Sequence, residues 1–289
     1  MPNTRDLKRR IRSIQSTQHI TRAMKMVAAA KLRKAQAQVT AARPYAAKLE
    51  EVIGRLIGAV EPETQPLAAS REIKKVGYVL FTGDRGLAGG YNANLIRLTE
   101  ERLRVEERAV ALVAVGRKGR DFFRRRRVEI VRDFTEIGDE PDLTQARELA
   151  RQLVDLYLAG TLDEVNLIYT RFYSALRQVP QVDRLLPIAA GAGGATGGVA
   201  GGPLGDYIYE PAPDAVLQAL LPRYCEIKVY RALLEAKASE HGARMTAMDS
   251  ATENAAEMID RLTLSFNRAR QAAITREILE VVAGAEALQ

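Results

Sequence analysis

The sequence predicts an α/β protein in which a long antiparallel coiled coil of N- and C-terminal helices carries a central, doubly wound α/β domain. Three observations predict this fold: an N-terminal run with helical periodicity that holds no glycine before Gly54, a C-terminal run with heptad spacing, and alternating strand-like and helix-like segments between them. The expected parts are the N-terminal helix at 1–60, the α/β domain at 73–190, a Gly/Ala-rich flexible loop at 191–209 and the C-terminal helix at 212–286.

The N-terminal segment is expected to form one helix from residue 3 to about residue 58. Alanine is frequent, and apolar residues recur in steps of three and four from Leu32 to Leu56. Pro44 lies inside this pattern. Because proline removes one backbone hydrogen bond and clashes with the preceding turn, we expect a kink there.

The C-terminal segment keeps a 3-4 spacing from Leu217 to Ala273 without a slip. This run of about eight heptads exceeds the three or four that indicate a coiled coil. Its seam residues are small and mixed, so the pair should bury little apolar area and be weak in isolation. Pro222 predicts a second kink near the helix start. Two long helices at opposite ends of a chain most simply pack against each other in antiparallel fashion.

The middle of the chain alternates between strands and helices, which predicts a Rossmann-like domain with a mainly parallel sheet. The last two strands are expected to form an antiparallel pair at one edge. The helices are expected from about Ala93, after Gly116, and at Leu143–Leu158. The expected strands are Lys75–Thr82, Ala109–Val115, Val128–Val131, Glu164–Phe172 and Val179–Pro187.

The charge of the chain is uneven. Residues 1–60 hold 13 Lys and Arg but only three Asp and Glu, whereas the remainder is slightly acidic. From Arg5 to Lys34 the only acid is Asp6. Such a face attracts nucleic acid, anionic lipid or an acidic loop of a protein partner. The alternative is a solvated helix face, although such faces usually mix both signs of charge.

Composition excludes several classes of protein. One cysteine leaves no internal disulfide and no cysteine-cluster metal site, and two histidines argue against a histidine metal site. No apolar run approaches the length of a membrane helix, and the basic N-terminus has no apolar core behind it that would mark a secretory signal. We expect a protein of a reducing compartment without metal, cofactor or catalytic residues. His241 is expected to be a hydrogen-bonded histidine that fixes the register of the coiled-coil seam, and Cys225 a small packing residue.

A Gly-rich turn at Thr82–Asn92, TGDRGLAGGYN, is the first candidate site. Glycines between a strand and a helix can cradle phosphate. Their spacing, however, fits neither G-x-G-x-x-G nor G-x-x-x-x-G-K-[ST]. We therefore expect a contact surface for another subunit rather than a nucleotide site. Its residues are Gly83, Asp84, Arg85, Gly86 and Gly89.

Four stretches resemble the gamma subunit of bacterial F-type ATP synthases. They are RSIQSTQHITRAMKMVAAAKLRKAQ near the N-terminus, ARPY at 42–45, TGDRGLAGGYN, and the segment from LLPRYCEIKVY to the C-terminus. The resemblance implies a rotor shaft whose tip stands inside a hexamer of alpha and beta subunits. The α/β domain would sit with epsilon on the ring of c subunits, attached to the cytoplasmic side of the cell membrane only through the complex. It also implies that proton flow is coupled to ATP synthesis or hydrolysis and that this chain breaks no bond itself.

Matching positions imply contacts with the alpha/beta hexamer. These are Lys8, Arg9, Met24, Lys25, Arg244, Arg270, Gln271, Thr275, Glu277 and Glu280. The redox-controlled cysteine pair of photosynthetic forms is excluded, because the chain has a single cysteine.

Two other classes of function remain open from the residues alone. A basic coiled-coil nucleic-acid-binding protein would explain the charge, but the basic run lacks interleaved aromatic residues and a reading module. A nucleotide-binding enzyme built on the α/β domain would explain the Gly-rich turn. DNA binding at physiological salt would indicate the first, and ATP or NAD binding to the isolated chain the second.

Overall fold

A computed structural model describes residues 4–60, 65–69, 71–188, 210 and 212–286. The loop expected at 191–209 lies outside the described residues. The chain forms two compact units: Met1–Ala28 with Met245–Gln289, and Ala29–Arg244.

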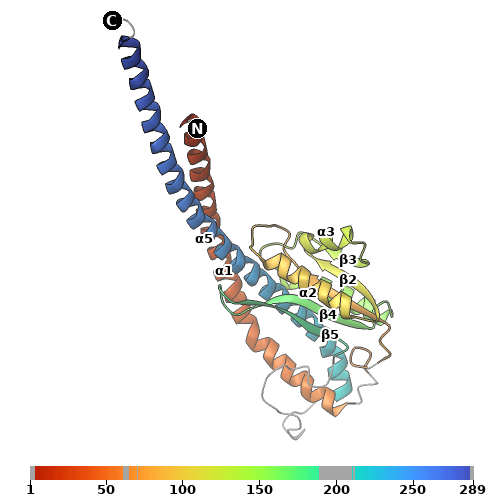
Figure 1. The fold of residues 1–289 in the computed structure, drawn as a ribbon. Helices are drawn as coiled ribbons and strands as arrows, with labels where there is room; N and C mark the ends of the chain where they lie inside the picture. Colours follow the sequence, from red (N-terminus) through yellow and green to blue (C-terminus); the bar gives the residue numbers. More distant parts are fainter. Residues whose placement is uncertain (1–3, 61–64, 70, 189–209, 211, 287–289) are drawn as a thin grey trace. The chain divides into compact units, whose positions relative to one another are not determined.

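The second unit is built around a five-stranded sheet with the order β3-β2-β1-β4-β5 (Figure 1). Strands β1 to β4 are parallel, and β5 pairs antiparallel with β4 at the edge. This confirms the mainly parallel sheet and its antiparallel edge. The strands are β1 (Lys75–Phe81), β2 (Ala109–Val115), β3 (Ile130–Phe134), β4 (Glu164–Phe172) and β5 (Gln178–Leu186).

Helices cover both faces of the sheet, as a doubly wound domain requires. Side chains of β1 alternate between the two faces: Val76, Tyr78 and Leu80 pack in one apolar cluster, and Val79 and Phe81 in the other. The first cluster includes residues of α2 (Tyr91–Val105) and α3 (Arg117–Arg125). The second includes residues of α4 (Leu143–Leu158) and of the two long helices.

Several strand ends differ from the expected ones: β1 ends at Phe81 rather than Thr82, β3 ends at Phe134 rather than Val131, and β5 begins and ends one residue earlier. Two element starts also differ, each for a local backbone reason. Strand β3 begins at Ile130 rather than Val128, because the chain first closes a turn after α3 with Arg127 at φ 58°. Helix α2 begins at Tyr91 rather than Ala93. Gly89 has φ 54°, and the Tyr91 amide donates to the Ala88 carbonyl, so the turn leads directly into the helix.

The two long helices are α1 (Thr4–Ala59) and α5 (Pro213–Glu286), and each continues through its internal proline. In the unit that holds the start of α1 and the end of α5, they lie side by side and antiparallel (Figure 1). The hydroxyls of Thr21 and Thr252 are 2.8 Å apart, and Lys25 Nζ lies 2.5 Å from Asp249 Oδ1. This confirms the antiparallel coiled coil.

The last turns of α5 extend beyond the start of α1. With Thr21 opposite Thr252, Thr4 lies opposite about residue 269 of an antiparallel neighbour. The following stretch of α5, up to Glu286, exposes large apolar side chains. These are Ile274, Ile278, Leu279, Val281 and Val282. None of the helices described is apolar over a length that would span a bilayer.

Candidate functional site

The Gly-rich turn at Thr82–Asn92 supplies hydrogen-bond acceptors for the first backbone amides of α3. A helix N-terminus presents free amides, which make it a site for phosphate groups. Here the first three amides of α3 already donate to the turn. The pairs are Arg117 N with Asp84 Oδ1 at 2.9 Å, Lys118 N with Gly83 O at 3.1 Å, and Gly119 N with Thr82 Oγ1 at 2.9 Å. The Asp84 carboxylate thus occupies the position that an anion would take.

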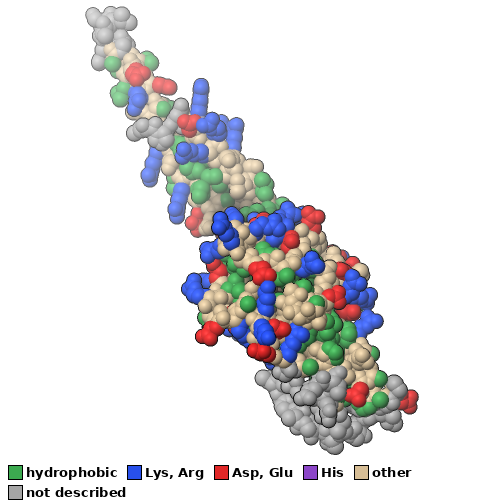
Figure 2. Space-filling model, turned by 90° about the vertical axis from the view of Figure 1, so that its right-hand side faces the viewer, with side chains coloured by type: hydrophobic (Ala, Val, Ile, Leu, Met, Phe, Trp, Pro, Cys, Tyr) green, Lys and Arg blue, Asp and Glu red, His purple; other side chains and the backbone are tan. Residues whose placement is uncertain are grey.

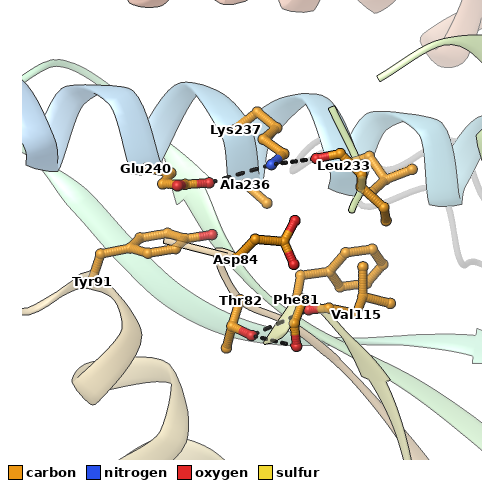
Figure 3. Close-up of a pocket in the computed structure, with 11 residues that line it drawn as sticks. Phe81, Thr82, Asp84, Tyr91, Val115, Leu233, Ala236, Lys237 and Glu240 are labelled. Atoms are coloured by element: carbon orange, nitrogen blue, oxygen red, sulfur yellow. Dashed lines mark hydrogen bonds and ion pairs between the residues drawn. The ribbon is translucent and has the colours of Figure 1, made fainter. Parts of the chain in front are cut away.

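Helix α5 covers the carboxyl ends of the central strands. Ligands of doubly wound domains bind at these strand ends. In this chain Leu233, Ala236, Lys237 and Glu240 of α5 lie over the ends of β1 and β2 (Figure 3). Only about 10 Å³ remains between them, roughly the space of one water molecule. A nucleotide therefore has no room at this point.

A second cavity, of about 420 Å³, lies beside the turn. Its charged lining holds four carboxylates and three cations, so it is a poor site for a polyphosphate. The carboxylates are those of Asp84, Glu136, Asp139 and Glu240, and the cations are those of Arg85, Arg117 and Lys237. Among the described residues no His, Cys, Asp and Glu cluster could hold a metal ion.

Glu240 of α5 joins the turn to the helix. Its side chain is 5 % exposed, and Oε1 accepts a hydrogen bond of 2.6 Å from Arg244 Nη2. The same Arg244 nitrogen lies 3.3 Å from the Gly86 carbonyl. The family resemblance implied that Arg244 contacts the alpha/beta hexamer. Its guanidinium, 12 % exposed, instead bonds to this chain's own turn, and a contact with the hexamer stays a prediction.

An acidic segment between β3 and α4 pairs with α1 and approaches α5. Asp139 Oδ2 lies 2.5 Å from Lys31 Nζ, and Glu140 Oε2 lies 2.5 Å from Lys34 Nζ, both on α1. On α5, His241 Nε2 lies 4.0 Å from Asp139 Oδ1. Burial lowers the pKa of His241, and the neighbouring carboxylates of Glu240 and Asp139 oppose this shift. The imidazole is therefore a packed, mainly neutral group at pH 7.

Cys225 cannot serve as a nucleophile in this fold. It is buried, and burial raises the pKa of its thiol to about 12. The thiolate, which is the reactive form, is therefore scarce at neutral pH. This agrees with the expected packing role.

The basic face of α1 is partly neutralised by this chain's own acids, which the sequence alone did not reveal. Lys25, Lys31 and Lys34 pair with Asp249, Asp139 and Glu140. These acids are more than 100 residues away in sequence, so no local pattern could have indicated the pairs. Lys and Arg side chains still project from the helices (Figure 2). Within the described ranges, no ion pair forms at Lys8, Arg10, Arg12, Arg22 or Arg33, whereas Arg9 pairs with Asp6 at 3.0 Å.

The other expected shaft contacts fall into two groups. Met24 is half-buried beside Lys25, opposite the part of α5 that holds Asp249. The remaining five are exposed on the stretch of α5 that extends beyond α1: Arg270, Gln271, Thr275, Glu277 and Glu280. Their surfaces are available to a partner, and their role stays a prediction.

Removing the Asp84 carboxylate should weaken the α/β domain. We expect Asp84→Ala to lower the free energy of unfolding by about 1 kcal/mol, because the Arg117 amide loses its cap. Asp84→Asn keeps an acceptor oxygen and should cost much less. Urea denaturation of both variants measures the difference. Equal stability of the alanine variant and the wild type would show that the cap is unimportant.

The sequence matches the ATP synthase family over residues 3–288. It is 80% identical over 289 residues to an ATP synthase gamma chain from Moorella thermoacetica, and 57% identical over 290 residues to one from Heliobacterium modesticaldum; each match covers both chains completely.

Solved structures agree in fold. A chain of the Tetrahymena thermophila mitochondrial ATP synthase central stalk and c-ring is 27% identical with a TM-score of 0.61, covering 80% of this chain and 99% of that one. A chain of the Euglena gracilis mitochondrial ATP synthase rotor is 19% identical with a TM-score of 0.66, covering 94% of this chain and 98% of that one. From the full-length sequence matches and the shared architecture, the chain belongs to the gamma chains of ATP synthase.

Proposed function

We propose that this gamma chain is the central rotor shaft of an F-type ATP synthase. It couples proton flow through the membrane sector to ATP synthesis or hydrolysis in the alpha/beta hexamer, and it breaks no bond itself. The observation that carries the proposal is the antiparallel pair of α1 and α5, from which the end of α5 extends as a single helix. Identity of 80% to a gamma chain over the whole length supports it.

The extended end of α5 is suited to a surrounding sleeve of protein. Five large apolar side chains between Ile274 and Val282 are about half or more exposed there. Apolar groups gathered on a surface mark an interaction site. The alpha and beta subunits would cover them, and the polar residues on the same turns, from Arg270 to Glu280, would contact the hexamer.

The basic side chains near the start of α1 would guide rotation rather than fix one position. Exposed charge pairs contribute only about 0–1 kcal/mol each. Contacts of Lys8 and Arg9 with acidic loops of beta would therefore be weak enough to break and re-form at successive angles. Met24 and Lys25, near the Asp249 contact, would lie where the shaft passes the hexamer.

The α/β domain would face epsilon and the ring of c subunits. Its Gly-rich turn keeps Arg85, Leu87, Gly89 and Gly90 exposed, whereas Thr82, Gly83, Ala88 and Tyr91 are buried. This exposed part of the turn would contact a neighbouring subunit. The chain would lie at the cytoplasmic side of the cell membrane and associate with it only through the complex.

Reconstitution tests the rotor function directly. The chain, mixed with alpha, beta and epsilon subunits and added to membranes that hold the c-ring sector, should enter a complex with one gamma per six large subunits. ATP hydrolysis should then acidify the vesicles, as followed with a pH-sensitive dye. A chain that stays outside the complex, or hydrolysis without acidification, would contradict the proposal.

Binding experiments on the isolated chain distinguish the rotor from the two other classes of function, an enzyme and a nucleic-acid-binding protein. Calorimetry should detect no binding of ATP or NAD to the isolated chain, because α5 fills the strand ends. A duplex DNA should not shift at physiological salt, since several basic residues are paired within the chain. Nucleotide binding would favour an enzyme, and a DNA shift would favour a nucleic-acid-binding coiled coil.

A further inference from the structure

We propose that Glu240 is a positioning residue that locks the α/β domain to α5, so that torque passes between them without slip. The inference rests on the proposed rotor function. A shaft transmits torque only if the domain that is driven cannot turn or slide on the helix that drives. Glu240 lies where the sheet's Gly-rich turn meets α5 (Figure 3).

The first support is the close fit of the Glu240 carboxylate against Gly83. A Cβ atom built at Gly83 would lie 2.8 Å from Glu240 Oε1 and 3.0 Å from its Cδ. These separations are shorter than a normal van der Waals contact, so a methyl group at Gly83 would push the Glu240 carboxylate out of its present position. The turn and the helix are therefore fitted to each other at this point.

The second support is a branched set of polar contacts. Glu240 bonds two cations of α5: Arg244 through Oε1 at 2.6 Å, and Lys237 through Oε2 at 3.5 Å. Each cation also donates to a backbone carbonyl of the α/β domain. Arg244 Nη2 reaches Gly86 O at 3.3 Å, and Lys237 Nζ reaches Ile137 O at 3.1 Å. One buried carboxylate thus orients two donors toward two different loops of the domain.

Directional contacts also join α5 to β4 and β5: Lys228 Nζ donates to Arg184 O at 2.5 Å, and Ser239 Oγ donates to Thr170 O at 3.0 Å. The Glu240 contacts are those that reach the loops at the carboxyl ends of the strands. Further along α5, residues such as Leu221, Val229 and Leu233 hold the domain through an apolar cluster. Apolar attraction is non-directional, so it resists separation better than sliding. Hydrogen bonds to charged groups are directional and fix the register between partners. The Glu240 contacts therefore resist slip at the loop end of the domain, where a single carboxylate orients two donors.

Two variants disturb this lock from opposite sides. Glu240→Gln removes the charge while keeping the shape, which avoids the larger cost of a cavity and of leaving Arg244 beside an empty space. Gly83→Ala introduces a methyl group against the carboxylate from the side of the turn. Both substitutions lie outside the unit formed by Met1–Ala28 and Met245–Gln289, which holds the coiled coil.

Matched controls are available for both. Glu235 is equally buried on the same helix, but it pairs with Arg231, which bonds Glu50 of α1 rather than a loop of the α/β domain. Glu235→Gln therefore removes a comparable charge without touching the lock. Gly54→Ala adds a methyl group on α1, outside the turn, at a position where no neighbouring atom lies within 4 Å.

Hydrogen exchange of the isolated chain is the first readout. In Glu240→Gln and Gly83→Ala, the amides of Gly83–Asn92 should exchange about 10- to 100-fold faster, as expected from losing a hydrogen bond to a charged group. The amides of β4 should change little. The two control variants should leave exchange in the turn close to that of the wild type.

Coupling in the reconstituted enzyme is the second readout. Both lock variants should hydrolyse ATP but lose a large part of the acidification obtained per ATP hydrolysed, whereas Glu235→Gln and Gly54→Ala should pump as the wild type does. Unchanged acidification per ATP in the lock variants would overturn the inference, as would equal losses in all four variants. If the wild type itself does not acidify the vesicles, the rotor function fails and the inference with it.

Discussion

Gly116→Ala is expected to lower the free energy of unfolding of the α/β unit by about 3 kcal/mol or more. Gly116 has φ 96°, a conformation that L side chains rarely adopt, and a Cβ atom there would lie 2.0 Å from the Thr82 carbonyl oxygen. Backbone strain contributes about 1–3 kcal/mol, and forcing an atom into a packed site adds a similar amount. Because the obstacle is backbone, no side-chain rotation relieves it. Urea denaturation followed by circular dichroism measures the loss.

Gly160 provides the matched control for this prediction. It also has a positive φ, 71°, but a Cβ atom there would meet no atom within 4 Å. Gly160→Ala should therefore lose only the strain of the left-handed backbone, about 1–2 kcal/mol. If both substitutions cost the same, the contact with Thr82 carries no energy and the strain alone explains the requirement for glycine.

The strand that ends just before Gly116 shows which parts of the fold follow from sequence. Strands such as Ala109–Val115 are continuous apolar runs ending at a glycine, so their existence could be predicted. The exact start of β3 could not, because it depends on Arg127 adopting a left-handed conformation, which this residue type rarely does. Element type is set by local pattern, whereas boundaries depend on single backbone choices.

The candidate site was predictable in outline but not in its contacts. The Gly-rich turn was visible as a motif, and its failure to match a phosphate loop argued against nucleotide binding, which stays a prediction. That Glu240 and Arg244 of α5 pack against this turn was not visible, because the contact joins residues more than 150 positions apart. The pairing of Lys31 with Asp139 was hidden for the same reason.

Removing three unpaired basic residues of α1 should impair the assembled enzyme without unfolding the chain. In the triple variant Lys8→Gln, Arg12→Gln and Arg33→Gln, all three positions are exposed and none forms an ion pair among the described residues. Glutamine is a good helix former, so stability should stay within about 0.5 kcal/mol of the wild type. Turnover or proton pumping should fall, because together the lost contacts with beta remove on the order of 1–3 kcal/mol of guidance.

The control removes three charges that this chain already uses internally. Lys31, Lys34 and Lys48 pair with Asp139, Glu140 and Glu51. Their replacement by glutamine should lower the free energy of unfolding of the chain by up to about 1 kcal/mol per pair. It should leave the contacts with beta, and therefore turnover and proton pumping, close to those of the wild type. Added salt should reproduce part of the first variant's defect in the wild type, since exposed charges are screened within about 10 Å at 0.1 M. If the first variant turns over and pumps as the wild type does at low salt, the basic face is only a solvated surface. If both variants lose pumping to the same extent, net charge matters and the position of the charges does not.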